Sequence, residues 1–371
     1  MSDLYIGLMS GTSLDGVDGV LVDFSGQQLR VRAHASAAFD ATFRAELLAL
    51  NTSGPDELHR AALAANALAR AYAGVVRQLL DATGVAPQAI RAIGAHGQTV
   101  RHRPQQFDGT GYTLQLNQPA LLAELCGVDV VADFRSRDVA AGGQGAPLVP
   151  PFHRALFGEL PGVTGVLNIG GISNLTLLNA NGAGSVLGFD CGPGNALMDG
   201  WCQLHTGAIF DDQGAWAAGG VVHTGLLQSL LTEPYLALPA PKSTGRDLFN
   251  AAWFEQRRQA FAQVDAQDVQ ATLTEFTALA CANSLKGLAP DCTRLIVCGG
   301  GALNTHLMAR LQALLPGCVV KDSAHHGLPP LQVEAAAFAW LARQCVERKT
   351  GSLQSVTGAR GARILGAVYP A

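Results

Sequence analysis

One pattern of strands and turns occurs twice in this chain, about 155 residues apart. Both copies place a hairpin rich in Gly and Ser/Thr between their first and second strands. A repeat of this size predicts a duplicated fold of two similar lobes, and 371 residues is a length typical of two domains. The first copy comprises Leu4–Met9, Gly16–Asp23 and 29–35, and the second comprises 163–168, 175–179 and 185–190.

Helical and strand patterns alternate through the rest of the chain, which is typical of the α/β class. Apolar residues recur at helical spacing over 56–83, with Pro55 suited to the first turn and Gly84 to the end. Strands are predicted at Ile90–Ala95 and Arg294–Cys298, and helices at 271–288, 302–315 and 333–347.

A Gly- and Pro-rich stretch over 140–151 is the best candidate for a hinge. We therefore predict an N-terminal lobe over 1–141 and a C-terminal lobe over 142–371, with a cleft between them. The tail 350–371 is a candidate to pack back on the first lobe.

Composition excludes several classes of partner. The net charge is −4 with no run of Lys or Arg, so no nucleic-acid surface is predicted. No segment approaches the roughly 20 apolar residues that a membrane span needs. Eight cysteines occur without C-x-x-C pairs or metal-ligand spacing, which indicates reduced, buried thiols. Together these features predict a cytoplasmic protein.

The first hairpin, Gly11-Thr-Ser-Leu-Asp-Gly-Val-Asp, has the chemistry of a phosphate-binding loop. Glycines allow backbone N–H groups to point inward, and two hydroxyls add further donors. Val17-Asp18 stands where a P-loop has Lys-Ser/Thr, so a P-loop NTPase is disfavoured. Acids beside phosphates require a metal ion between them, and Asp15 is the candidate Mg²⁺ ligand. The alternative is a polar turn that closes an exposed hairpin. The predicted binding residues are Gly11, Thr12, Ser13, Leu14, Asp15, Gly16, Val17 and Asp18.

Two further glycine clusters are candidates for the same ligand. Gly170 and Gly171 lie in the second hairpin, in the position that matches the first loop. Gly299, Gly300 and Gly301 separate a strand from a helix, where absent side chains would admit a ribose or a flat ring, and Asn304 follows. A ligand-free Gly-rich hairpin is the alternative for the first cluster. No G-x-G-x-x-G string occurs, so a Rossmann dinucleotide site is unexpected.

Asp190 ends a strand above a Gly-Pro-Gly turn, which suits a general base; the alternative is a helix-capping Asp. Polar residues of mixed hydrogen-bonding type are candidates to bind a sugar, with surface or capping roles as the alternative. His325-His326 is read as a structural pair, and the loop at Lys242 receives no role. The candidate acceptor residues are His96, Gln98, Thr99, Asp133, Arg135, Asp138 and Glu334.

Eight strings in order resemble the anhydro-N-acetylmuramic acid kinase family, and the similarity continues to Leu365-Gly-Ala-Val-Tyr-Pro. They are Met9-Ser-Gly-Thr-Ser-Leu-Asp-Gly-Val-Asp, His96-Gly-Gln-Thr-Val, Ala132-Asp-Phe-Arg, Gly142-Gly-Gln-Gly-Ala-Pro-Leu-Val-Pro, Asn168-Ile-Gly-Gly-Ile-Ser-Asn, Gly188-Phe-Asp-Cys-Gly-Pro-Gly-Asn, Pro241-Lys-Ser-Thr-Gly-Arg and Cys298-Gly-Gly-Gly-Ala-Leu-Asn. Asp247 stands where we associate a glutamate with the family's loop.

This resemblance implies a duplicated ribonuclease H-like, actin-like ATPase fold. It implies ATP with Mg²⁺ as donor and 1,6-anhydro-N-acetylmuramic acid as acceptor, in peptidoglycan recycling. Water would open the anhydro ring and O6 would take the phosphoryl group. Asp190 matches the family's base, Gly11–Asp18 its phosphate segment and Glu334 an acid near the sugar. The family also suggests a homodimer. The alternatives are another sugar or carboxylate kinase or a phosphatase of the superfamily, a nucleotide-gated sugar-binding module, and a sensor that binds without turnover.

Overall fold

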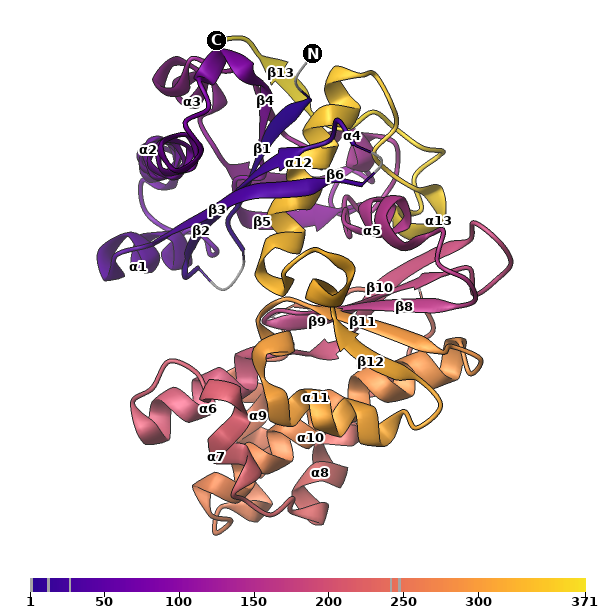
Figure 1. Ribbon diagram of the computed structural model, residues 1–371. Helices are drawn as coiled ribbons and strands as arrows, with labels where there is room; N and C mark the ends of the chain where they lie inside the picture. The colour runs from indigo at the N-terminus through magenta and orange to yellow at the C-terminus, as the bar shows by residue number, and fades with distance from the viewer. Residues whose placement is uncertain (1–2, 12–13, 27, 241, 246–247) are drawn as a thin grey trace. The chain divides into compact units, whose positions relative to one another are not determined.

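The computed structural model describes residues 3–11, 14–26, 28–240, 242–245 and 248–371 (Figure 1). Contacts divide the chain into two compact units. Unit 1 comprises Met1–Phe152 and Gln332–Ala371, and unit 2 comprises His153–Leu331. The chain therefore leaves unit 1 later than the boundary predicted at residue 142. It also returns to unit 1 before the predicted tail, because the helix after residue 332 belongs there as well.

The sheet of unit 1 carries the first meander. Its strand order is β13-β7-β4-β1-β2-β3. β1 pairs antiparallel with β2 and parallel with β4, and β4 continues parallel to β7. The C-terminal strand β13 pairs antiparallel with β7, so the end of the chain completes this sheet. The strands are β1 (Leu4–Met9), β2 (Gly16–Asp23), β3 (Arg30–Ala38), β4 (Ile90–Ala95), β7 (Val130–Ala132) and β13 (Ala367–Tyr369).

The sheet of unit 2 repeats this plan. Its order is β10-β9-β8-β11-β12, with β8 antiparallel to β9 and parallel to β11. Without β13, the order in unit 1 is the same: third, second and first meander strands, then two parallel strands. The α/β class and the duplication predicted from the two meanders are confirmed. The strands are β8 (Thr164–Ile169), β9 (Ile172–Leu178), β10 (Val186–Pro193), β11 (Arg294–Cys298) and β12 (Val319–Asp322).

Two long helices cover opposite faces of the unit 1 sheet (Figure 1). Ile6 and Leu8 of β1 belong to an apolar cluster with residues of α2 (Glu57–Thr83). Successive strand side chains point to opposite faces, so Gly7 faces the other side. There a side chain would overlap the backbone of α12 (Val333–Val346), which runs directly over this glycine.

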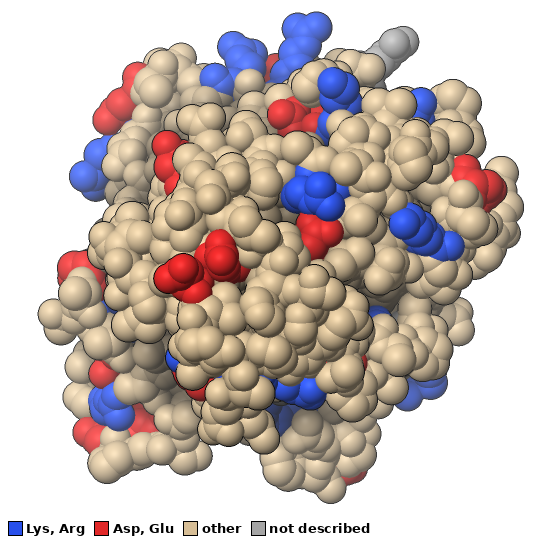
Figure 2. Space-filling model, turned by 90° about the horizontal axis from the view of Figure 1, so that it is seen from below, with Lys and Arg blue, Asp and Glu red and all other residues tan. Residues whose placement is uncertain are grey.

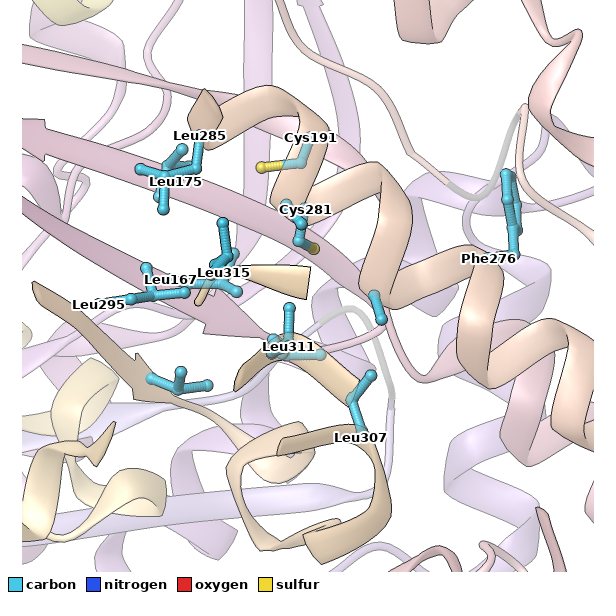
Figure 3. Close-up of a cluster of buried hydrophobic side chains, with 14 of the residues drawn as sticks. Leu167, Leu175, Cys191, Phe276, Cys281, Leu285, Leu295, Leu307, Leu311 and Leu315 are labelled. Carbon is cyan, nitrogen blue, oxygen red and sulfur yellow. The ribbon is translucent and has the colours of Figure 1, made fainter. Parts of the chain in front are cut away.

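The core of unit 2 lies between its sheet and the helices α10 (Ala266–Leu288) and α11 (Thr305–Leu314). Figure 3 shows this cluster, in which Leu167 of β8 and Leu295 of β11 lie near Leu311 and Leu315. Full burial of one such leucine side chain contributes roughly 1.5–3 kcal/mol. The apolar residues from which the strands were predicted therefore stabilise the unit through their burial.

The remaining elements connect these layers. In and next to unit 1 they are α1 (Ala41–Ala49), η1 (Pro87–Ala89), β5 (Gln98–Pro104), β6 (Gly111–Leu116), α3 (Pro119–Cys126), α4 (Ser136–Ala140), α5 (Pro150–Phe157), η7 (Pro330–Gln332) and α13 (Gln354–Thr357). In unit 2 they are α6 (Ala196–Thr206), η2 (Asp212–Gly214), α7 (Ala215–Ala218), α8 (Thr224–Leu231), η3 (Pro234–Ala237), α9 (Ala251–Arg258), η4 (Gln259–Phe261), η5 (Gly300–Leu303) and η6 (Ser323–His326).

Several predicted boundaries require correction. The helix predicted over 302–315 is a 3-10 turn, η5, followed by α11, because Asn304 has extended backbone and caps the new helix. Pro55 lies before α2, whose N-cap Asp56 is left-handed, whereas Gly84 ends the helix as predicted. α10 begins earlier than predicted, at Ala266.

The predicted hinge is part of unit 1 and is held in place by the buried carboxylate of Asp138. Its Oδ2 accepts from the Gly145 N–H at 2.8 Å. Its Oδ1 accepts from the Thr357 hydroxyl at 2.8 Å, which ties the stretch to the C-terminal part of the chain. Asp138, a candidate sugar contact, thus has a role in the fold.

Charged side chains cover little of the face of the molecule drawn in Figure 2. On the face drawn in Figure 2, basic and acidic side chains are interspersed in a largely uncharged surface, without an extended area of one sign. Among the described residues, no helix combines the length and apolar character that a membrane crossing requires.

Candidate functional site

Asp190 lies at a bulge in β10, the edge strand of the unit 2 sheet. Asp190 pairs with Asn174 of β9, and Gly192 pairs with Ser173, so Cys191 is the extra residue. A bulge locally bends the strand and can re-aim a side chain. The glycines on either side of Pro193 permit this path: Gly192 has a φ of 148°, and a side chain at Gly194 would overlap the Gly170 carbonyl oxygen.

The environment of Asp190 suits a general base. Burial raises its pKa to about 6, while the Thr244 N–H and the nearby Lys242 ammonium oppose that shift. The Thr244 N–H donates to Oδ2 at 3.0 Å. A carboxylate with a pKa close to the working pH is deprotonated often enough to accept a proton, yet basic enough to pull it.

The second glycine hairpin is fixed to the start of α6. The Asn195 N–H donates to the Gly170 carbonyl oxygen at 2.7 Å, and the Gly194 N–H donates to that of Gly171 at 3.0 Å. The Asn195 side chain donates to the Ile169 carbonyl oxygen at 3.2 Å. The hairpin therefore has one defined conformation, with its carbonyl groups held by the turn after β10.

The third glycine cluster meets this hairpin at the carboxyl ends of β8 and β11. A side chain at Gly301 would overlap Ile169, and Gly299 has a φ of 78° and approaches Asn168 and Ile169. Close packing on β8 is thus one physical reason for these glycines, besides any approach of a ligand. The side-chain oxygen of Asn304 caps α11, where it accepts from the Leu307 N–H at 2.9 Å.

An open pocket of about 390 Å³ lies beside Asn304. Its volume is in the range of about 300–1,000 Å³ typical of small-molecule sites. It is lined by Asp212, Gln213, Ala215, Ala218, Thr305 and His306. None of these residues was predicted as a site residue, because residues 212–218 belong to no predicted motif and Thr305 and His306 lie just beyond the glycine cluster that ends at Asn304.

In unit 1 the first hairpin joins β1 to β2, as predicted. The side chains of Leu14 and Val17 are buried in apolar clusters, so only their backbone could face a ligand. Asp15 is exposed. Asp18 lies 3.3 Å from the His34 imidazole across β2 and β3. Thr12 and Ser13 lie outside the described residues.

The glycines that flank this loop differ in role. A side chain at Gly16 would overlap the Ala37 carbonyl oxygen of β3. Gly16 is therefore required by the sheet itself, while Gly11 is partly exposed and accepts from the Leu14 N–H at 3.2 Å through its carbonyl oxygen.

A buried polar network joins this loop to the predicted acceptor residues. The His96 Nδ1–H donates to the Ser10 carbonyl oxygen at 3.3 Å, and the Ser10 hydroxyl donates to Gln98. Arg135 donates to His96 Nε2 from two nitrogens, at 3.1 and 2.8 Å. Burial and the Arg135 charge lower the pKa of His96 to about 3, so the imidazole is neutral with a defined tautomer.

The other predicted acceptor residues have identified contacts in unit 1. Burial lowers the pKa of Arg135 to about 10. The negative charge of Glu334, in the first turn of α12, opposes this shift because it favours the protonated guanidinium. Thr99 Oγ1 accepts from Gln115 at 3.2 Å. Asp133 is exposed and accepts from the Ser136 hydroxyl at 2.5 Å, an arrangement typical of a turn. Sugar contact by these residues remains a prediction.

The described residues contain no cluster of three or more His, Cys, Asp or Glu side chains that could form a protein-only metal site. His325 pairs with Asp322 at 3.0 Å, consistent with the structural reading of the two histidines. Mg²⁺ commonly binds through one or two carboxylates together with substrate phosphates, so an exposed Asp15 remains a suitable ligand for a nucleotide-borne ion.

The chain is similar to a known protein family over almost its whole length. The family model described as anhydro-N-acetylmuramic acid kinase matches residues 3–371. The chain belongs to this family. Kinases of this family phosphorylate a sugar. This chain is therefore a kinase that transfers a phosphoryl group to a sugar hydroxyl.

Individual relatives agree over the full length. The anhydro-N-acetylmuramic acid kinase of Albidiferax ferrireducens is 64% identical, with 100% of both chains covered. That of Variovorax paradoxus is 64% identical over 100% of this chain and 99% of its own. Among solved structures, an ADPNP-bound activator of 2-hydroxyisocaproyl-CoA dehydratase from Clostridium difficile has a TM-score of 0.49 at 12% identity, covering 93% of this chain and 96% of its own. That likeness is too distant to bear on the function of this kinase.

The structure adds contacts of Asp190 that the motif alone did not predict. Lys242 and Thr244 belong to a loop for which no function was predicted. Tyr235 lies in an apolar stretch that contains no predicted site residue. Both segments are distant from Asp190 along the chain. The string that contains Lys242 and Thr244 carries the family resemblance, but no short-range pattern relates it to Asp190. Arg246 and Asp247 of the same loop lie outside the described residues.

Proposed function

We propose that this chain is an ATP-dependent kinase that opens 1,6-anhydro-N-acetylmuramic acid with water and phosphorylates the freed O6. The oxygen of water bonds to C1, and the C1–O6 bond breaks. O6 takes the γ-phosphoryl group, so the products are ADP and N-acetylmuramic acid 6-phosphate. The proton released by water passes to Asp190.

The observation that carries this proposal is the environment of Asp190. Its pKa of about 6 allows a carboxylate that accepts a proton near neutral pH. A kinase that acts on an ordinary alcohol also uses a base, but here the base would act on water, as in a glycosidase. One carboxylate suffices, because the departing O6 bonds to phosphorus and needs no proton from a second acid.

The assignment of ATP rests on the glycine segments and the pocket. In unit 1 the β1–β2 hairpin would bind phosphate oxygens through backbone N–H groups. In unit 2 the Gly170–Gly171 hairpin and the Gly299–Gly301 turn meet around Asn195, and the pocket beside Asn304 would receive the nucleoside. Mg²⁺ bound with ATP and held by Asp15 would neutralise charge on the phosphates.

The acceptor assignment rests on the network around Arg135. Its guanidinium is a partly buried donor group beside neutral His96, and Glu334 adds an acceptor from α12. Such a mixture of donors and acceptors suits a sugar that carries hydroxyl, amide and carboxylate groups. We further propose, from the family resemblance, that the enzyme works in the cytoplasm as a homodimer; sedimentation velocity of the purified protein tests the dimer.

The test is turnover in ¹⁸O-water with ATP, Mg²⁺ and the anhydro sugar. We expect ¹⁸O at C1 of a 6-phosphorylated product. Asp190→Asn should lower kcat by roughly 10²–10⁴-fold, because that is the usual contribution of a general base. Asp291→Asn, an exposed acid of the same unit, is the control and should retain activity.

Three outcomes would contradict the proposal. If ¹⁸O appeared in the phosphate but not at C1, water would attack phosphorus and not the anhydro ring. Turnover of plain hexoses in preference to the anhydro sugar would favour another sugar kinase. Binding of ATP and sugar without ADP release would favour a nucleotide-gated binding protein.

A further inference from the structure

One short segment of unit 2 occupies the outer edge of β10 at Asp190. The Tyr235 hydroxyl donates to the Asp190 carbonyl oxygen at 2.8 Å. The Asp190 N–H donates to the Lys242 carbonyl oxygen at 3.0 Å. The Thr244 N–H donates to the Asp190 carboxylate at 3.0 Å. The backbone and the side chain of the same residue are thus fixed by Tyr235, Lys242 and Thr244.

Lys242 closes this segment on itself. Its ammonium donates to the carbonyl oxygens of Tyr235 and Leu236 at 3.1 and 3.0 Å. It also lies 4.7 Å from the centre of the Tyr235 ring, a distance at which a cation is attracted to the ring face. Lys242 therefore joins η3 to the loop residues 242–244, which contact Asp190. We call Tyr235, Lys242 and the backbone of 242–244 the latch.

Tyr235 is itself held rigidly. Glu233, only 8% exposed, accepts from the Tyr235 N–H at 3.3 Å. The same carboxylate accepts from Trp253 Nε1 at 2.8 Å and from Arg257 at 2.9 Å. The Tyr235 ring packs edge-to-face on Phe249, with centres 5.9 Å apart. A phenol fixed at both ends can fix the carbonyl group that it contacts.

We propose that Tyr235 and Lys242 are positioning residues that hold the Asp190 carboxylate in the orientation of a general base. An edge strand has no neighbour to define its outer side, and the bulge removes regular pairing at this point. The latch supplies the missing constraint. The inference rests on the proposed role of Asp190, because reacting groups must be held to a fraction of an ångström.

Lys242 has a second effect that a purely structural residue would lack. Its positive charge favours the ionised form of Asp190. The other titratable neighbours, Tyr235 and Cys191, stay uncharged because burial raises the pKa of each. Asn174, opposite on β9, carries no charge. Removal of the Lys242 charge should therefore raise the pKa of Asp190.

The experiment compares Tyr235→Phe and Lys242→Met with wild type. Tyr235→Phe keeps the ring and loses only the hydroxyl. We expect kcat for the anhydro sugar to fall about 3- to 10-fold, as for the loss of one hydrogen bond, with KM for ATP within about twofold. For Lys242→Met we expect the acidic limb of kcat/KM to move to higher pH. Lys242→Arg should return that limb to its wild-type position.

Matched controls separate the latch from general effects. Tyr112→Phe removes a phenol from the β5–β6 hairpin, and Lys286→Met removes the same charge from an exposed position of α10. Both should keep the kcat and pH profile of wild type. Wild-type kcat in Tyr235→Phe together with an unmoved acidic limb in Lys242→Met would overturn the inference. If Lys242→Met does not fold, the kcat of Tyr235→Phe alone tests the inference.

A direct titration keeps this test independent of turnover. In protein labelled with ¹³C at the aspartate carboxyls, Asp190 is the resonance that Asp190→Asn removes. We expect it to titrate at higher pH in Lys242→Met than in wild type or Lys286→Met. An inactive wild type would sink the proposed function alone, whereas an unshifted Asp190 resonance would overturn the charge effect of the latch.

Discussion

At the scale of single residues, the proposed base Asp190 is expected to lower the stability of the folded state. An ordinary Asp has a pKa of 3.8, and burial raises that of Asp190 to about 6. The folded state therefore binds this proton more tightly than the unfolded chain does. Stability falls as the pH rises from about 4 to about 6, and above that range the charged form carries the whole penalty, at most about 3 kcal/mol.

Asp190→Asn is accordingly expected to raise the melting temperature at pH 7.5 while it lowers kcat. Asparagine keeps an oxygen that can accept from the Thr244 N–H, so mainly the buried charge is lost. At pH 4 the gain should largely vanish. Thermal unfolding at both pH values checks this, with Asp291→Asn as the exposed control. A gain of equal size at both pH values would contradict the role assigned to the buried charge.

At the scale of elements, the contact of α12 with the unit 1 sheet depends on two paired glycines. Gly7 of β1 pairs with Gly94 of β4. Side chains at these positions would overlap the carbonyl oxygens of Ala335 and Phe338. The helix thus lies directly on the backbone of two adjacent strands, and both overlaps are with main chain that cannot rotate away.

Gly7→Ala and Gly94→Ala should therefore each destabilise the protein by about 3 kcal/mol or more, in the upper range for overpacking. Gly74→Ala is the matched control, since a methyl group there meets nothing within 4 Å. It should stabilise α2 by roughly 0.5–1 kcal/mol. Denaturant unfolding monitored by circular dichroism measures all three variants. Equal effects of the three substitutions would show that close approach of α12 is unimportant.

For the whole molecule, the division into units is discontinuous along the chain. Unit 2 is one segment with its own sheet and core. Unit 1 needs both chain ends, because α12 covers one face of its sheet and β13 extends it. A fragment of residues 1–152 alone would expose the face of β1 and β4 that α12 covers.

Fragments are expected to reflect this difference. Residues 153–331 should fold alone, with a cooperative thermal transition. Residues 1–152 should fold only when 332–371 is supplied as a second chain, because apolar strands without their cover aggregate. Circular dichroism and amide NMR spectra check both. A stable, cooperative 1–152 fragment would refute the requirement for the C-terminal segment.

Much of this architecture could be predicted from local pattern. The spans of β1, β2, β4 and β11 and the end of α2 at Gly84 agree with the sequence, because apolar periodicity and glycine act over a few residues. The predicted lobe boundary failed for the opposite reason. A helix belongs to the unit whose sheet it covers. The residues of α12 do not indicate, by themselves, which of the two sheets that is.

The two glycine-rich hairpins show the same limit. Their repeated position in two meanders was enough to predict the duplication, since backbone pairing and side-chain alternation are local and regular. Gly16, Gly194 and Gly301 are each required by close packing, and a motif cannot distinguish this requirement from the approach of a ligand. The sequence by itself determined the duplicated α/β plan and singled out Asp190. Only the tertiary structure brought Tyr235, Lys242 and Thr244 to that carboxylate, because such contacts join segments that no local pattern relates.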